Sequence, residues 1–438
     1  MEWWVAGISI FSVFLVLLLM GLPVAFVFMA INVAGVFLFW GGTIGLQQLI
    51  FSIWSSVSTF SLLPVPLFVL MGEVMFLSGI APLMIDSMDK WLGRLPGRLA
   101  LLALGGGTAF SFMSGSSISS VAMLGSVLVP DMEKRGYSKS MSIGPILGSG
   151  LLAGMIPPAS LAVFLAAIAQ ISVGRLLMAI IIPGLIMATL YAPYIIIRCW
   201  LDPSLAPSYK PTPTPLVEKL ISTVRHILPL GGIVFLVIGV IFIGMATPSE
   251  AAALGALGCF VLAALYGKMN WEMLKKSVSG TLRVSGMIFL IFTGAIAYSQ
   301  ILAFTGVTSN LVGLATGLPV HPMVILIAMQ FLVLIMGMFM DASSILMVCL
   351  PIYMPIVYAL GFDPIWFGVV MLINVEIGLI SPPFGFCLFT MKGVAPADST
   401  MGDIYRAAIP YCILDVLLMG LVIAFPILAL WLPGLMMK

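Results

Sequence analysis

The chain has 438 residues, of which 62% are hydrophobic and only 8% are charged, and its formal net charge is +2. Soluble globular proteins have about 25% charged residues, so this composition excludes that class, and so small a net charge gives no sign of nucleic-acid binding. Many apolar runs reach the roughly 20 residues that a helix needs to cross a bilayer, without the alternation of β-barrel strands. We therefore expect an all-α integral membrane protein.

Residues 1–205 are predicted to cross the membrane five times. The predicted elements are, in chain order, spans at 3–20 and 24–40, an amphipathic piece at 47–58, a span at 60–78, a charged interfacial helix at 82–98, a helical hairpin at about 99–130, a broken span at about 142–171 and a span at 176–197. The hairpin is predicted because Gly105-Gly106-Gly107 and Ser114-Gly115-Ser116-Ser117 interrupt an apolar run. The chain would enter the membrane there and return on the same side.

The broken span contains Gly154-Met155-Ile156-Pro157-Pro158. Paired prolines remove two backbone N–H donors and prevent a continuous helix. Within hydrocarbon, such a break is tolerated only where the freed backbone groups line a cavity or are buried in protein. The break returns as Gly378-Leu379-Ile380-Ser381-Pro382-Pro383, and paired breaks in corresponding halves indicate a transporter binding site.

A proline-rich segment at 206–225 is predicted to be a cytoplasmic linker to a second domain, 226–438. The elements predicted there are spans at about 226–245 and 248–267, an amphipathic piece at 271–283, a span at 285–305, a second hairpin at about 323–359, a span at about 365–391 that is broken at the second proline pair, and a last span at about 408–431.

The two halves are related by an offset near 225 residues, which pairs Pro130 with Pro355 and the two proline pairs with each other. With five crossings in each half, the second half would have the opposite orientation in the membrane to the first. Basic residues change sides accordingly, since the turn at 131–139 has three and its counterpart at 356–364 has none. With a periplasmic N-terminus, all 18 Lys and Arg except Arg175 and Lys438 would lie on the cytoplasmic side. The sequence therefore predicts an inverted repeat.

Short polar side chains gather where the two hairpins turn. They are Ser114, Ser116, Ser117, Ser119 and Ser120 in the first hairpin, and Asp341, Ser343 and Ser344 in the second. Ser149 and Asn374 lie on the broken spans and match each other with the same offset. Hydroxyl, amide and carboxylate oxygens suit Na⁺, and helix N-termini at the breaks suit an anionic substrate. Serines are also common in packed membrane helices, so packing is the alternative explanation for either serine cluster.

Other polar residues within the apolar segments have simpler explanations. Glu73 and Glu376 are either satisfied polar contacts or functional groups, Asp415 is expected to pair with Arg406, and Glu250 is expected to cap a helix. The five cysteines are scattered without CxxC spacing, so neither a disulfide nor a metal cofactor is expected. No nucleotide-binding motif is present, so uphill transport would need an ion gradient or another subunit.

Three stretches resemble one family. They are "SGSSISSVAMLGSVLVPDMEKRGY", "GLLAGMIPPASLAVFLAAIAQISVGRL" and "NVEIGLISPPFGFCLF". They look like the large membrane subunit of tripartite ATP-independent periplasmic (TRAP) transporters, and the resemblance extends over essentially the whole chain. It implies a multi-pass protein of a bacterial inner membrane, without enzymatic activity, that imports organic acids such as C4-dicarboxylates or sialic acid with Na⁺ as the coupling ion. It also implies an elevator motion, a periplasmic substrate-binding protein, and a small four-helix membrane subunit as a separate chain.

The resemblance also implies site residues. The Na⁺ ligands would be Ser116, Ser117, Ser149 and Gly150 in the first half, and Asp341, Ser343, Asn374 and Gly378 in the second. The substrate would lie near Ser119, Pro157, Pro158, Ser344, Pro382 and Pro383. Two alternatives stay open: a stand-alone Na⁺/dicarboxylate carrier of the same fold, and, more remotely, an intramembrane enzyme that uses Asp341 and Glu376.

Overall fold

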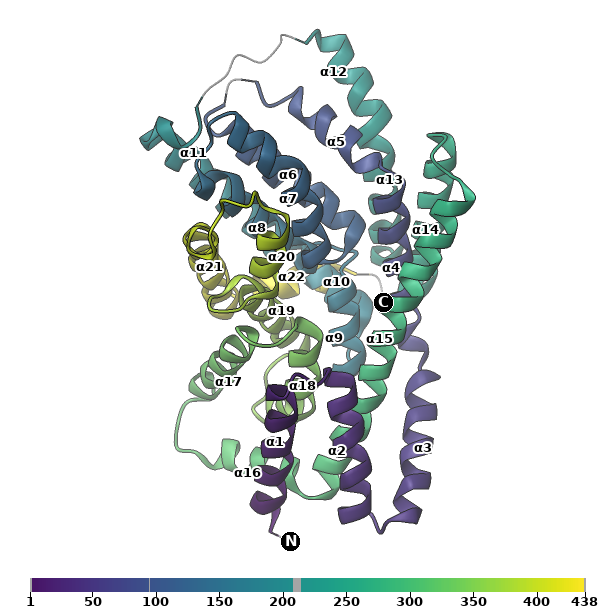
Figure 1. The fold of residues 1–438 in the computed structure, drawn as a ribbon. Coiled ribbons are helices and arrows are strands. Elements are labelled where there is room, and N and C mark those ends of the chain that lie inside the picture. Colours follow the sequence, from purple (N-terminus) through teal and green to yellow (C-terminus); the bar gives the residue numbers. More distant parts are fainter. Residues whose placement is uncertain (1, 94, 208–213, 437–438) are drawn as a thin grey trace.

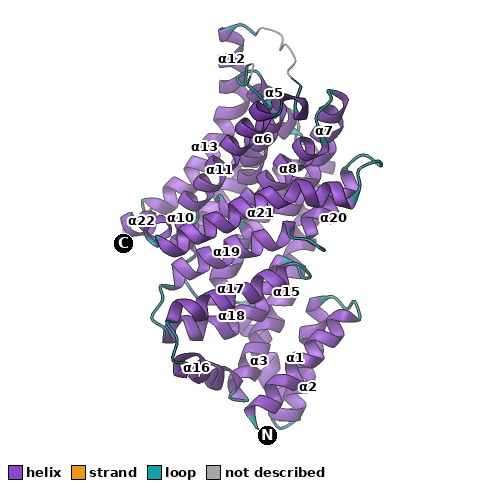
Figure 2. Cartoon of the chain, turned by 90° about the vertical axis from the view of Figure 1, so that its left-hand side faces the viewer, coloured by secondary structure: helices purple, strands orange, loops and turns teal. Residues whose placement is uncertain are grey.

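The computed structural model describes residues 2–93, 95–207 and 214–436, and the regular elements in these ranges are all helices (Figures 1 and 2). Seven of these helices are long and apolar enough to cross a membrane, or eight if one bent pair counts as a single span. The prediction of an all-α membrane protein is confirmed. Residues 208–213 of the proline-rich segment lie outside the described residues, as does the side chain of Ser114.

The helices of the first half are α1 (Trp3–Leu19), α2 (Val24–Phe39), α3 (Thr43–Val57), η1 (Phe60–Leu62), α4 (Pro64–Leu77), α5 (Ile80–Asp89), α6 (Arg98–Ser114), α7 (Ser117–Lys134), α8 (Lys139–Met155), α9 (Ser160–Ala169), α10 (Val173–Ala179), α11 (Ile181–Leu201) and η2 (Pro203–Leu205). Those of the second half are α12 (Leu216–Ser222), η3 (Thr223–Ile227), α13 (Leu228–Phe242), α14 (Pro248–Leu265), α15 (Trp271–Phe304), α16 (Val307–Gly317), α17 (Pro322–Gly337), α18 (Ala342–Ala359), α19 (Pro364–Ile380), α20 (Phe386–Val394), α21 (Met401–Ala424) and α22 (Ile427–Leu435).

The helix bounds follow the predicted offset closely in the central part of each half. Helices α7 and α8 span 117–134 and 139–155, and adding 225 gives the bounds of α18 and α19, 342–359 and 364–380. The first helices of the two hairpins, α6 and α17, end at Ser114 and Gly337. These matched lengths support the predicted repeat, and the opposite orientation of its two halves stays a prediction.

Several predicted boundaries differ from those of the structure, among them those of two spans in the second half. The amphipathic piece at 271–283 and the span at 285–305 form one helix of 34 residues, α15. In the first half, Pro64 and Pro66 separate the corresponding pieces into α3 and α4, and no proline lies within α15 to do so. The predicted last span at 408–431 is replaced by α21, which ends at Ala424 before Pro426, and by the separate helix α22.

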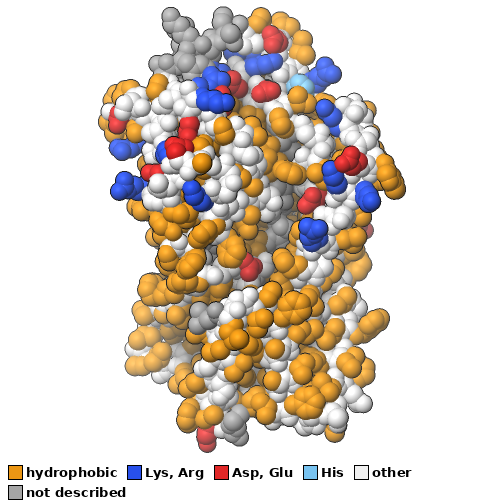
Figure 3. All heavy atoms as spheres, in the orientation of Figure 1, with side chains coloured by type: hydrophobic (Ala, Val, Ile, Leu, Met, Phe, Trp, Pro, Cys, Tyr) orange, Lys and Arg blue, Asp and Glu red, His pale blue; other side chains and the backbone are white. Residues whose placement is uncertain are grey.

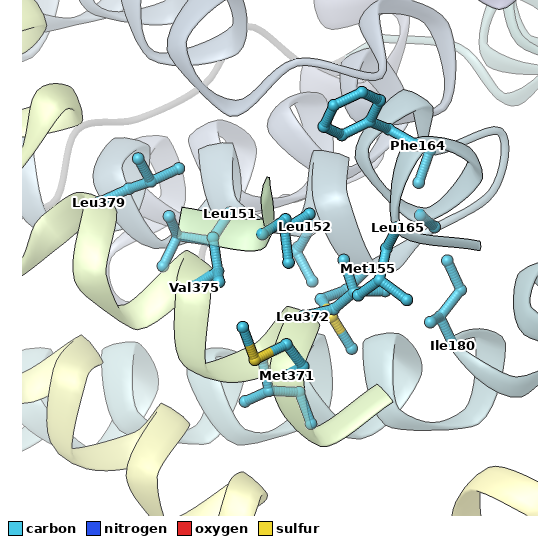
Figure 4. Close-up of a cluster of buried hydrophobic side chains, with 14 of the residues drawn as sticks. Leu151, Leu152, Met155, Phe164, Leu165, Ile180, Met371, Leu372, Val375 and Leu379 are labelled. Atoms are coloured by element: carbon cyan, nitrogen blue, oxygen red, sulfur yellow. The ribbon is translucent and has the colours of Figure 1, made fainter. Parts of the chain in front are cut away.

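The two proline-broken helices form the centre of the molecule. Every residue of α8 from Met141 to Met155 is buried, and so is every residue of α19 from Ile365 to Ile380. A helix that is apolar and buried on all sides belongs to the interior of a bundle. Leu151, Leu152 and Met155 of α8 lie in one buried cluster with apolar side chains of α9 and α19, which Figure 4 shows. This apolar packing holds the two breaks at the middle of the fold.

Charged side chains are distributed unevenly along the long axis of the molecule. On the face drawn in Figure 3, Lys and Arg gather at the upper end, where Figure 1 places α5 and α12, and hydrophobic side chains cover the lower half. The N-terminus lies at the opposite, lower end (Figure 1). This is the distribution that the positive-inside rule predicts for a cytoplasmic upper end.

Candidate functional site

Each hairpin turns against the break of the broken helix in its own half. In the first half, the Ser160 hydroxyl donates a hydrogen bond of 2.7 Å to the carbonyl oxygen of Gly115, at the turn between α6 and α7. In the second half, the backbone N–H of Gly385 donates one of 3.4 Å to the carbonyl oxygen of Met338, at the turn between α17 and α18. These contacts place each hairpin turn beside a break, and the binding of an ion or substrate there stays a prediction.

Glycines make these close approaches sterically possible. Gly115 has a φ of +56°, and a Cβ there would lie 3.0 Å from the carbonyl oxygen of Pro158. A Cβ on Gly378 would lie 2.6 Å from the Cα of Gly337, so α17 and α19 touch backbone to backbone. Such contact requires residues without a side chain and brings the turn of the second hairpin directly onto α19.

The serines of the first hairpin lie in different environments. Ser116 caps α7, and its side chain accepts a hydrogen bond from the backbone N–H of Ser119 at 3.4 Å. Ser119 is exposed and Ser120 is buried. Ser117 is buried, and its hydroxyl donates a hydrogen bond of 2.8 Å to Oε2 of Glu376 on α19. Ser117 therefore connects the first hairpin to the broken helix of the other half.

Ser149 and Gly150 pack against the two helices of the first hairpin. Ser149 is fully buried, and a Cβ on Gly107 of α6 would lie 2.2 Å from its hydroxyl oxygen. A Cβ on Gly150 would lie 2.5 Å from Val121 Cγ2 of α7. Both residues therefore hold the hairpin against α8 by close packing.

Asn374 has a partner that sequence reasoning missed. Its side-chain nitrogen donates hydrogen bonds to the backbone oxygen and to Oε1 of Gln330 on α17, at 2.6 and 2.8 Å. Both residues are buried, and Oδ1 of Asn374 and Nε2 of Gln330 make no hydrogen bond among the described residues. A lone glutamine in the apolar stretch "IAMQFLVLI" was the available signal. The pair leaves one amide oxygen beside the second hairpin.

Asp341 caps a helix. Its carboxylate accepts hydrogen bonds from the backbone N–H of Ser344, at 3.1 Å, and from the Ser344 hydroxyl, at the start of α18. Ser344 is fully buried, and Ser343 is half-buried. The structure thus gives Asp341 and Ser344 a local structural role, and ion binding by these residues stays a prediction.

The two proline pairs differ in exposure. Both X–Pro bonds, Pro157–Pro158 and Pro382–Pro383, are cis. Pro157 and Pro158 are buried beneath the turn of the first hairpin, whereas Pro382 is half-buried, Pro383 is exposed and Phe384 is 49% exposed. In this conformation, only the second break reaches the surface.

The expectation that Asp415 pairs with Arg406 is wrong. Asp415 is fully buried, and it accepts a hydrogen bond of 2.5 Å from the Tyr191 hydroxyl of α11. Nine residues separate Asp415 from Arg406, which places them on opposite faces of an α-helix. Glu250 forms the predicted capping box with Thr247.

A charged contact joins the loop after α20 to the start of α8. The Lys139 ammonium lies 2.8 Å from Oδ2 of Asp398 and 3.9 Å from Oδ2 of Asp403. The hydrogen bond from Lys139 holds the pKa of the Asp398 carboxyl below its usual range. This contact connects the start of the first broken helix to the loop that follows the second broken helix.

Two helical hairpins packed on two proline-broken helices, inside an all-α membrane protein, define the chain as a membrane transporter. A solved transporter structure, Alcanivorax borkumensis YdaH, has a similar fold, with a TM-score of 0.61, 15% identity and coverage of 88% of this chain and 90% of that one. The model of the tripartite ATP-independent periplasmic transporter DctM component matches residues 11–428, and the chain belongs to this family.

Relatives agree with the family model. The C4-dicarboxylate TRAP transporter large permease protein DctM of Pseudomonas aeruginosa is 30% identical over 393 residues, which cover 89% of this chain and 90% of that protein. The isethionate TRAP transporter permease protein DctMQ of Oleidesulfovibrio alaskensis is 31% identical over 398 residues, which cover 89% of this chain and 60% of that protein. The predicted family is confirmed.

Proposed function

We propose that this chain is the large transport subunit of a Na⁺-coupled TRAP transporter that imports a small organic anion across a bacterial inner membrane. A soluble periplasmic protein delivers the substrate, and a small membrane subunit accompanies the large one as a separate chain. The hairpins and broken helices move together as an elevator relative to the remaining helices. No further cofactor takes part.

The helix ends at the breaks support this proposal. Helices α8 and α19 end at Met155 and Ile380, beside the starts of α9 and α20 at Ser160 and Phe386. Helix C-termini carry partial negative charge and favour cations, whereas N-termini offer N–H groups and partial positive charge to anions. Each break therefore supplies both kinds of helix end, as co-transport of a cation and an anion requires.

The observation that carries the Na⁺ assignment is the buried amide oxygen of Asn374. Oδ1 makes no hydrogen bond among the described residues, while the side-chain nitrogen is held by Gln330 on the second hairpin. A buried polar atom without a partner is costly, and a bound cation would satisfy it. Amide and hydroxyl oxygens are suitable ligands for such a hard ion.

The organic anion class rests on the relatives. The named substrates of the two relatives, C4-dicarboxylates and isethionate, share a small size and a negative charge. Because these substrates differ in their acidic groups, we expect the binding protein to select among them. The particular acid carried here is therefore best sought by ligand screening of the cognate binding protein.

Uptake into proteoliposomes tests the proposal. The large subunit is reconstituted with the small subunit and loaded binding protein, and radiolabelled substrate is followed with and without an inward Na⁺ gradient. We expect uptake only with both Na⁺ and the binding protein. Uptake that is unchanged without Na⁺ would overturn the coupling, and uptake without the binding protein would favour the stand-alone carrier of the same fold.

Cysteine labelling tests the membrane orientation. Glu2 lies at the end poor in basic residues, and Glu272 lies near Lys275 and Lys276 at the start of α15. We expect a Glu2→Cys variant to react with a membrane-impermeant thiol reagent in intact spheroplasts. A Glu272→Cys variant should react only after permeabilisation. The reverse pattern would place the N-terminus in the cytoplasm.

A further inference from the structure

Glu376 joins three elements of the candidate site. Its Oε2 accepts the 2.8 Å hydrogen bond from Ser117, the first residue of α7. Its Oε1 occupies the space beside Gly154 of α8, where a Cβ would lie only 1.9 Å away. The side chain is 1% exposed. One carboxyl group of the second half therefore contacts both the hairpin and the broken helix of the first half.

Nothing in the packing of the repeat requires an acid here. The 225-residue offset pairs Glu376 with Leu151, which is fully buried in the apolar cluster between the broken helices. The ion pairs of the described residues do not include Glu376, and its titratable neighbours, Asp415 and Cys387, are not cations. An acid in the membrane interior is costly and usually has a function.

The contact with Ser117 indicates that function. A serine hydroxyl has one hydrogen to donate and two lone pairs to offer. Because Glu376 accepts the hydrogen, the hydroxyl cannot rotate freely, and its lone pairs point away from Glu376. Carboxylates that orient a metal-binding side chain in this way typically change metal affinity about 10–100-fold when they are removed.

We propose that Glu376 is a positioning residue for cation binding, which holds the Ser117 hydroxyl oriented as a Na⁺ ligand. The inference rests on the proposed Na⁺ coupling and on the sequence prediction that Ser117 is a Na⁺ ligand. Since Ser117 and Glu376 come from different halves, the affinity of the first-half cation site depends on where α19 lies. Through Glu376, the affinity for a cation at the first hairpin would therefore change with the position of the second broken helix.

The test measures the Na⁺ concentration that gives half-maximal uptake in proteoliposomes. We expect Glu376→Ala to raise it about 10–100-fold, with the maximal rate at saturating Na⁺ affected far less. Glu376→Gln retains an oxygen that accepts the Ser117 hydrogen bond, so it should stay close to wild type. In the matched control, Leu151→Ala, truncation at the equivalent position should lower thermal stability without changing the half-maximal Na⁺ concentration.

A steric variant tests the geometry without changing the carboxyl group. Gly154→Ala places a methyl group in the space of Oε1 and displaces the Glu376 side chain. It should therefore raise the half-maximal Na⁺ concentration, as Glu376→Ala does. Combining the two substitutions should add no further loss. An unchanged half-maximal Na⁺ concentration in Glu376→Ala, with wild-type uptake still dependent on Na⁺, would overturn this inference alone. Wild-type uptake that does not depend on Na⁺ would overturn the proposed coupling, and this inference with it.

Discussion

Replacing Gly378 by alanine is expected to abolish uptake and to lower the thermal stability of the protein. A Cβ at this position would lie 2.6 Å from the Cα of Gly337, and backbone atoms cannot move aside as a flexible side chain can. Overpacking typically costs about 1–3 kcal/mol even among side chains. Because Gly337 ends α17 next to the turn of the second hairpin, the displacement falls directly on the candidate site.

The matched control is Gly286→Ala. Gly286 also lies within a helix, α15, and a Cβ there would meet no atom within 4 Å. Alanine is favoured over glycine in a helix by about 1 kcal/mol, so this variant should be as stable as wild type or more so. Thermal unfolding followed by fluorescence-detected size exclusion compares the two. A Gly378→Ala protein with wild-type stability and uptake would contradict the backbone contact.

The second large effect is expected for Asn374→Leu, which should abolish Na⁺-dependent uptake. The leucine has a similar volume, but it leaves Oε1 of Gln330 buried without its donor, and the Gln330 backbone oxygen loses the bond that it accepts in addition to its helical one. Each buried group that loses its partner costs about 1–3 kcal/mol. The substitution also removes Oδ1, the oxygen proposed to bind Na⁺.

A double variant separates these two losses. Replacing both members of a buried polar pair by apolar groups is often nearly neutral for stability. Gln330→Leu combined with Asn374→Leu should therefore recover much of the lost thermal stability. If Oδ1 is a cation ligand, uptake stays absent in the recovered protein. Recovery of Na⁺-dependent uptake would show that Asn374 serves packing alone. Asn310→Leu, on the exposed helix α16, controls for the general effect of losing an amide.

The hairpins and breaks were predictable because their signals are local. Paired prolines end a helix wherever they occur, and the runs around Gly115 and Asp341 contain the glycine and capping residues of turns. The continuous length of α15 was harder to predict, because its first turns carry the charges of an interfacial helix. Only the absence of proline indicated that these turns continue into a span.

The side-chain contacts of the site were not predictable in the same way. Asn374 with Gln330, and Ser117 with Glu376, join residues 44 and 259 positions apart. No periodicity within one helix specifies which side chains meet across such distances. The offset between halves located Ser149 and Asn374, but it failed for Glu376, because the repeat has a leucine at the equivalent position.

The length of α15 has a consequence for the proposed elevator. At 1.5 Å per residue, its 34 residues extend about 51 Å, whereas the hydrocarbon layer is only about 30 Å thick. The 21 residues after Arg283 alone fill that layer, so Arg283 lies at one edge of it and Lys275 and Lys276 lie beyond that edge. Sinking α15 by two turns, about 11 Å, would draw Arg283 into the hydrocarbon, where a charged residue costs about 2.5–3.5 kcal/mol at full depth. In the proposed elevator, α15 would therefore belong to the helices that stay in place while the hairpins and broken helices move.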